Sequence, residues 1–126
     1  MVSTLSLVAL GGAIGATLRY LAGIVVIRLA GHHEFPVAIL TINAVGSLLM
    51  GVFVVAAAQR GLTHLSPLVM TGILGGFTTF SAFSLETMTL IERGAMGQAA
   101  LYVLLSVGLS VGGLALGLVL ARGVFA

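Results

Sequence analysis

The chain has 126 residues, of which 60% are hydrophobic and 6% are charged, and its mean hydropathy is +1.27. A soluble domain of this length carries far more charge, so the composition excludes one and indicates that the bilayer is the solvent. The isoelectric point near 10.0 reflects five arginines against three glutamates without a basic stripe, which argues against a nucleic-acid partner, and the absence of cysteine excludes disulfides and thiolate metal sites.

Charged and turn residues divide the chain into four apolar runs, each longer than the roughly 20 residues that cross a bilayer as a helix. Because backbone polar groups cannot stay unpaired in lipid, the runs are predicted to be transmembrane helices of a single membrane domain, residues 1–126. The predicted helices cover about residues 4–29, 37–58, 67–91 and 97–121. This division leaves no residues for a soluble domain.

The first predicted helix carries an ionisable residue, Arg19, about nine residues inside its Arg28 end, which is roughly 13 Å at 1.5 Å per residue. Gly15 and Gly23 lie four residues before and after it, on the same face, so Arg19 is expected to point into the protein. Two interpretations stay open. Arg19 is either a hydrogen-bonded residue of the interior, or an anchor whose guanidinium reaches back to the interface.

The second predicted helix contains one carboxamide, Asn43, in the stretch TINAVGS. Gly46 and Ser47 share its face at spacings of three and four residues. An amide offers two N–H donors and one acceptor, which suits an anion. The alternative is a hydrogen bond between helices that only holds the bundle together.

The third predicted helix is interrupted by the stretch GGFTTFSAFSLE, residues 75–86. Two glycines in mid-span predict a break at about 75–79, where the following threonines and Ser81 can pair the freed backbone groups. Broken helices at membrane depth often coordinate ions through exposed carbonyls. Phe80 and Phe83, three residues apart, can present positive ring edges to an anion, although packing or lipid contact also explains bulky rings.

The fourth predicted helix places Tyr102, Ser106 and Ser110 in one line, four residues apart. The line is interpreted as a polar track, although serines in helices also commonly bond the carbonyl four residues earlier. Two GxxxG pairs, 108/112 and 113/117, indicate close helix packing.

The arginines at the helix ends are evenly divided between the two sides of the membrane. Arg60 and Arg122 fall on one side and Arg28 and Arg93 on the other, so the usual cytoplasmic excess of basic residues is missing. A chain with so little topological bias can insert both ways and pair with an inverted copy of itself. Four helices alone enclose a pathway with difficulty, which also favours a homo-oligomer.

Three stretches together resemble the Fluc (CrcB) family of small bacterial fluoride channels: GGAIGATLRY (11–20), TINAVGSLLMG (41–51) and GGFTTFSAFSLE (75–86). They occur in the family's order over nearly the whole chain. The resemblance implies an all-α integral membrane protein with four transmembrane helices and a broken third helix. It further implies an antiparallel, dual-topology homodimer with two fluoride pathways in the bacterial cytoplasmic (inner) membrane.

The resemblance also assigns roles to individual residues. Asn43 corresponds to a pore-facing residue, and Phe80 and Phe83 correspond to the rings that contact the ion. The backbone carbonyls of Gly75 and Thr78, two from each subunit, are implied to hold a structural Na⁺ at the dimer interface, without an organic cofactor. The remaining residues beside the implied fluoride pathway are Thr79, Ser81, Ser84, Glu86, Tyr102, Ser106 and Ser110. Arg19 matches a structural polar position, and its detailed role stays open.

The sequence therefore predicts a passive fluoride-selective channel that exports fluoride and protects the cell from its toxicity. The alternative is a proton-coupled small multidrug-type exporter, which needs a central carboxylate. The first helix has no acid, and Glu86 lies toward the end of the third. A third class is a membrane assembly protein whose glycine faces serve packing alone. An enzyme is not expected, because His32, His33 and His64 all fall in predicted loops.

Overall fold

The computed structural model describes residues 1–31 and 35–125, and the described chain is all-helical. Its first two long helices are α1 (Val2–Ala30) and α2 (Val37–Arg60), and its last is α5 (Met96–Phe125). The third span consists of four shorter pieces: η1 (Thr63–Leu65), the π-helix η2 (Pro67–Leu74), α3 (Gly75–Phe77) and α4 (Phe80–Glu92). All four spans are long and apolar enough to cross a membrane, which confirms the predicted number of helices. The third span is bent, as predicted, because its helix is interrupted between α3 and α4.

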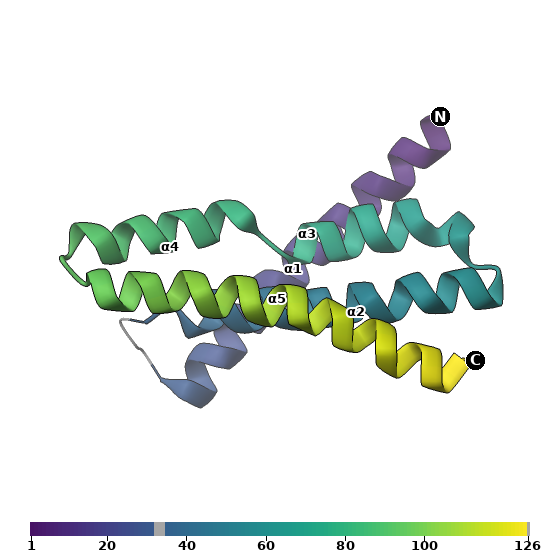
Figure 1. Cartoon of the computed structure of the whole chain (residues 1–126). Coiled ribbons are helices and arrows are strands. Elements are labelled where there is room, and N and C mark those ends of the chain that lie inside the picture. Colours follow the sequence, from purple (N-terminus) through teal and green to yellow (C-terminus); the bar gives the residue numbers. More distant parts are fainter. Residues whose placement is uncertain (32–34, 126) are drawn as a thin grey trace.

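The third span forms two arms on either side of its bend (Figure 1). One arm, η2 with α3, packs on α1, whereas the other arm, α4, runs along the first half of α5 (Figure 1). The most extensive contact joins α2 to α5. Both chain termini and the turn between α2 and η1 lie at the same end of the bundle, as four membrane crossings require (Figure 1).

Three glycines let the helix backbones approach closely at two of these contacts. A Cβ added at Gly15 would meet the Ile73 carbonyl oxygen, and one added at Gly117 would meet the carbonyl oxygen of Leu48 on α2. Gly113 faces α2 as well, so the second predicted GxxxG pair does pack. The first pair, 108/112, has open space around both glycines, so it makes no close helix contact within the described chain.

The break falls at Thr78 and Thr79, inside the predicted range 75–79 but after the two glycines. Gly75 is helical, with φ −64° and ψ −36°, whereas Thr78 and Thr79 have extended backbones with ψ 157° and 120°. Gly76 serves packing instead, because an added Cβ would lie only 2.8 Å from the Gly12 carbonyl oxygen of α1. Gly75 and Gly76 therefore do not cause the break, contrary to expectation. The helix ends because side-chain hydrogen bonds hold the two threonines that follow.

Of the three histidines predicted to lie in loops, the structure describes one. His64 is exposed in the short turn η1, and His32 and His33 lie outside the described residues. Among the residues that the structure describes, no group of three or more His, Cys, Asp or Glu side chains could hold a metal ion.

Candidate functional site

The break is tied to α2 by a pair of hydrogen bonds from one side chain. The Thr79 N–H donates to Asn43 Oδ1 over 2.8 Å, and Asn43 Nδ2 donates to the Thr79 carbonyl oxygen over 3.0 Å. The interhelical alternative for Asn43 thus holds in the structure. One of the two Nδ2 hydrogens remains for another acceptor, because an amide nitrogen carries two donors.

The hydroxyls at the break pair backbone groups that the missing helical turn leaves free. Thr78 Oγ1 donates to the Leu74 carbonyl over 3.0 Å, and Thr79 Oγ1 accepts the Ala82 N–H over 3.1 Å, as the N-cap of α4. Ser81 contributes differently, because its hydroxyl lies 3.2 Å from Thr79 Oγ1. The two threonines therefore have the predicted pairing role, and Ser81 supports one of them.

Because of these hydrogen bonds, two backbone carbonyl groups lose the N–H donors that they would have in a continuous helix. In a continuous helix the Thr79 N–H would bond the Gly75 carbonyl, and the Ala82 N–H would bond the Thr78 carbonyl. Here the first N–H bonds Asn43 and the second bonds Thr79 Oγ1. The carbonyl oxygens of Gly75 and Thr78 thus lose their usual helical partners and are left to accept from elsewhere or to bind a cation.

A cavity of about 290 Å³ lies between α2, the break, α4 and α5. It brings together six residues that the sequence placed beside the pathway: Asn43, Thr79, Phe80, Phe83, Ser106 and Ser110. The rest of its lining is Ser47, Thr78, Val107 and Val111. Polar groups from two helices and the break therefore converge with two phenyl rings of α4 on one apolar-walled space, which is the usual composition of a small-ligand site.

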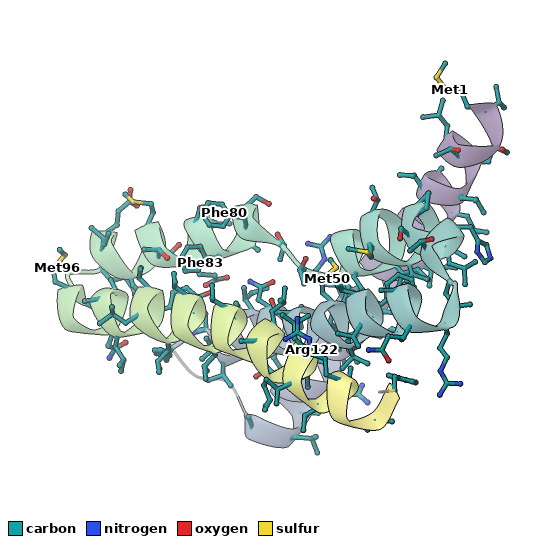
Figure 2. All side chains as sticks on the ribbon, turned by 45° about the vertical axis from the view of Figure 1, so that its right-hand side comes forward. Met1, Met50, Phe80, Phe83, Met96 and Arg122 are labelled. Carbon is teal, nitrogen blue, oxygen red and sulfur yellow. The ribbon has the colours of Figure 1, made fainter. Side chains whose placement is uncertain are left out.

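The aromatic rings beside this cavity form a chain from its open side to the interior. Phe80 is 78% exposed, and its ring centroid lies 5.3 Å from that of Phe83. Phe83 lies between α4 and α5 in Figure 2, and its ring centroid is 5.4 Å from that of the fully buried Tyr102. Phe35 packs edge-on against the other side of Tyr102, at 5.5 Å. The buried Tyr102 ring therefore holds Phe83 from behind, whereas Phe80 is left largely uncovered by the described part of the chain.

Two buried hydroxyls on α5 have no hydrogen-bond partner in the described chain, those of Tyr102 and Ser106. They lie one helical turn apart on the same face, and Ser106 lines the cavity. Leaving a buried hydroxyl unpaired costs free energy, so such groups in a native protein call for a partner that protein atoms do not supply. A small polar guest in the cavity could accept from the Ser106 hydroxyl directly, whereas Tyr102 lies one turn behind it and does not line the cavity.

The remaining pathway candidates lie apart from this cavity. The Ser84 hydroxyl donates to the Phe80 carbonyl within α4, over 3.0 Å. Glu86 lines a different cleft of about 520 Å³ between α1, α2 and α4, together with Arg19 and Tyr20. Arg19 is half-buried there, and no ion pair joins it to Glu86 in the described part of the chain. The structure thus separates these groups from the residues around Asn43.

The sequence reading missed two contributors to the site. Ser47 lines the cavity one turn beyond Asn43, and its shared helical face was the available signal. Phe35 supports Tyr102 from the segment before α2, which reads as a loop residue and offered no signal.

Comparison with known proteins gives consistent relatives over the full chain. The sequence model of the family described as CrcB-like protein, Camphor Resistance (CrcB), matches residues 6–118. A protein of Ruegeria sp. (strain TM1040) named fluoride-specific ion channel FluC is 66% identical over 124 residues, which are 98% of each chain. A protein of the same name from Roseobacter denitrificans (strain ATCC 33942 / OCh 114) is 69% identical over 123 residues, 97% of this chain and 98% of that one. Another from Jannaschia sp. (strain CCS1) is 74% identical over 104 residues, 79% of this chain and 99% of that one.

Proposed function

This chain belongs to the CrcB-like family, and from that premise we propose that it is a passive, fluoride-selective ion channel that lets fluoride leave the cytoplasm. The observation that carries the proposal for this chain is the convergence of Asn43, Phe83 and Ser106 on one cavity that contains a buried, unpartnered hydroxyl. The exporter alternative finds no support in the geometry, because Glu86 lies in a separate cleft.

The groups around the cavity suit a small, strongly hydrated anion. Fluoride gives up water only if other donors replace it, and the Ser106 hydroxyl together with the spare Asn43 N–H are such donors. The positive edges of Phe80 and Phe83 add attraction without a fixed charge. None of the described residues that line the cavity is cationic, so binding stays weak enough for release.

The proposed pathway is completed by a second copy of the chain in the inverted orientation. Phe80 is 78% exposed although it lines the cavity, and Gly75 is exposed at the break. A partner chain across this face would cover both residues. The even division of arginines between the two ends, with Arg60 and Arg122 opposite Arg28 and Arg93, supports dual topology.

The break has the features of a structural sodium site. The Gly75 and Thr78 carbonyls have lost their helical donors, and neutral backbone oxygens of unwound helices are the ligands that Na⁺ takes in membrane proteins. Two carbonyls from one chain are too few for a hard cation, whereas two from each of two chains give four. The residues therefore fit a shared ion, which would hold the two breaks together.

Reconstitution tests the proposed function directly. Purified protein in liposomes loaded with sodium fluoride and sodium chloride, with a sodium ionophore added so that the counter-ion can leave, should release fluoride without a pH gradient and retain chloride, as followed with ion-selective electrodes. Proton-dependent efflux of organic cations would point to the exporter, and equal leakage of both halides would contradict a fluoride-selective channel. Protein-free liposomes are the control.

Replacing Tyr102 by Phe should lower fluoride flux about tenfold without lowering stability. The hydroxyl makes no hydrogen bond of ordinary geometry in the described chain, so its removal should change the free energy of unfolding little. A hydroxyl that donates to a charged group contributes about 1.5–3 kcal/mol, which accounts for the expected loss of flux.

Flux and the midpoint of thermal unfolding should be measured together for Tyr102→Phe. Tyr20→Phe is the matched control, because Tyr20 is 71% exposed and belongs to α1, not to the buried face of α5 that carries Tyr102 and Ser106. Wild-type flux in Tyr102→Phe would show that this hydroxyl does not serve the ion, and a lowered unfolding midpoint would show that it has a structural partner instead.

A further inference from the structure

We propose that Asn43 is a positioning residue that holds the extended segment of the third span in place, so that only one of its two amide hydrogens is left for the permeating ion. This inference deepens the proposed function and rests on it for the identity of that ion. Asn43 then has two tasks that separate experimentally: it binds the backbone of Thr79, and it offers one donor to the cavity.

The first task follows from the geometry of two hydrogen bonds. Asn43 accepts from the Thr79 N–H over 2.8 Å and donates to the Thr79 carbonyl over 3.0 Å. A residue in an antiparallel sheet exchanges the same two bonds with its neighbour, so the carboxamide takes the place of a second strand. Thr79 is extended and buried, and no strand lies beside it among the described residues.

This pairing matters more in a membrane than it would in water. Backbone groups of an interrupted helix have no water to bond in the hydrocarbon region, so a protein group must satisfy them. A hydroxyl at position 43 is too short and carries its donor and its acceptor on a single atom, so it cannot span the N–H and the C=O of Thr79, whereas an amide serves both in one plane. The extended backbone opposite position 43 thus favours a planar side chain with a donor and an acceptor on separate atoms.

The same face of α2 also sets the position of the break along the helix. Gly46 lies one turn beyond Asn43, and a Cβ there would meet the Thr78 Cγ2 methyl and lie 3.1 Å from the Phe77 ring. Two consecutive residues of the break therefore contact this face: Thr79 bonds Asn43, and Thr78 packs against Gly46. By taking the Thr79 N–H, Asn43 also removes the helical donor of the Gly75 carbonyl.

The second task follows from counting hydrogens. Nδ2 carries two, one of which bonds the Thr79 carbonyl, and Asn43 lines the cavity. An aspartic acid at this position, when protonated, has one O–H and one carbonyl oxygen. It can reproduce both bonds to Thr79, but it has no donor left for an anion.

Hydrogen exchange of the Thr79 amide tests the first task independently of flux. The amide should be measured by NMR of ¹⁵N-threonine-labelled protein in lipid nanodiscs, with rates corrected for the intrinsic effect of pH. We expect at least tenfold faster exchange in Asn43→Ala. Thr41→Val is the matched control, because Thr41 bonds only the Val37 carbonyl of its own helix and should leave the rate unchanged.

Asn43→Asp separates the two tasks and keeps the test decisive if Asn43→Ala does not fold. The chain contains no other aspartate, so a ¹³C-aspartate label reports the protonation of this carboxyl alone. At a pH where the label shows a neutral acid, Thr79 protection should return to within twofold of the wild type. Fluoride flux at the same pH should stay at least tenfold below the wild type.

The positioning role would be overturned if the Thr79 amide of Asn43→Ala exchanged at a rate within twofold of the wild type. It would also be overturned if the Thr79 amide of Asn43→Asp stayed unprotected while the new carboxyl is neutral. Wild-type flux in Asn43→Asp under the same conditions would overturn the role of the spare N–H. If the wild-type protein carried no fluoride at all, the proposed function would fail, and the exchange rates would still decide whether Asn43 positions Thr79.

Discussion

Replacing Phe83 or Phe80 by Ile is expected to lower fluoride flux at least tenfold while the protein keeps its assembly state. Isoleucine fills a similar volume but has no ring edge to present to an anion. A tenfold loss corresponds to about 1.4 kcal/mol of barrier, which is the order of one aromatic contact beyond simple packing. Phe83 should show the larger effect, because the buried Tyr102 ring holds it in place at 5.4 Å between centroids.

Phe35→Ile is the matched control for these two variants. Phe35 packs on the opposite side of Tyr102 and does not line the cavity, so its replacement should lower stability and leave halide selectivity intact. Flux in liposomes and elution volume in size-exclusion chromatography give the two readouts. Wild-type flux in Phe80→Ile and Phe83→Ile would contradict the role of the ring edges, as would a flux loss matched by Phe35→Ile.

Gly46→Ala is expected to abolish most of the flux, by at least tenfold, although it adds a single methyl group. The added Cβ would meet Thr78 Cγ2, and Thr78 cannot turn away easily because its hydroxyl bonds the Leu74 carbonyl over 3.0 Å. Overpacking of this kind costs about 1–3 kcal/mol. The strain falls on the extended residues that separate α3 from α4, so the break should shift relative to α2.

Gly97→Ala provides the control, because it makes the same substitution on a transmembrane helix at a site with open space around it. Its flux and unfolding midpoint should match those of the wild type. Thr79 amide exchange in Gly46→Ala should rise as it does in Asn43→Ala, since both substitutions disturb the same contact. A fully active Gly46→Ala protein would mean that the position of the break tolerates displacement and does not control conduction.

The polar groups of this protein fall into two sets with different duties. Thr78 and the Thr79 hydroxyl are occupied in completing the broken helix, through bonds to Leu74 and Ala82. The Tyr102 and Ser106 hydroxyls make no hydrogen bond of ordinary geometry in the described chain. A substitution in the first set should therefore affect folding and flux together, whereas one in the second should affect flux alone.

The sequence predicted part of this division of the polar groups. Spacing of four residues predicted that Tyr102, Ser106 and Ser110 share a face, and the cavity receives two of them. Spacing could not predict that Ser84 would bond its own helix or that Glu86 would lie in another cleft. Those outcomes depend on how α4 is rotated against α1 and α5, which no local pattern specifies.

By itself the sequence determined that the chain lies in a lipid bilayer, that it has four long helices and that the third span is interrupted. Each of these follows from hydropathy and backbone pairing over short stretches, which are local properties. Only the tertiary structure decided where the interruption falls and what ends the helix. In a continuous helix the Thr79 N–H would donate to the carbonyl four residues earlier, whereas here it donates to a carboxamide 36 residues away. Only the packing of α2 against the third span brings that carboxamide within 2.8 Å.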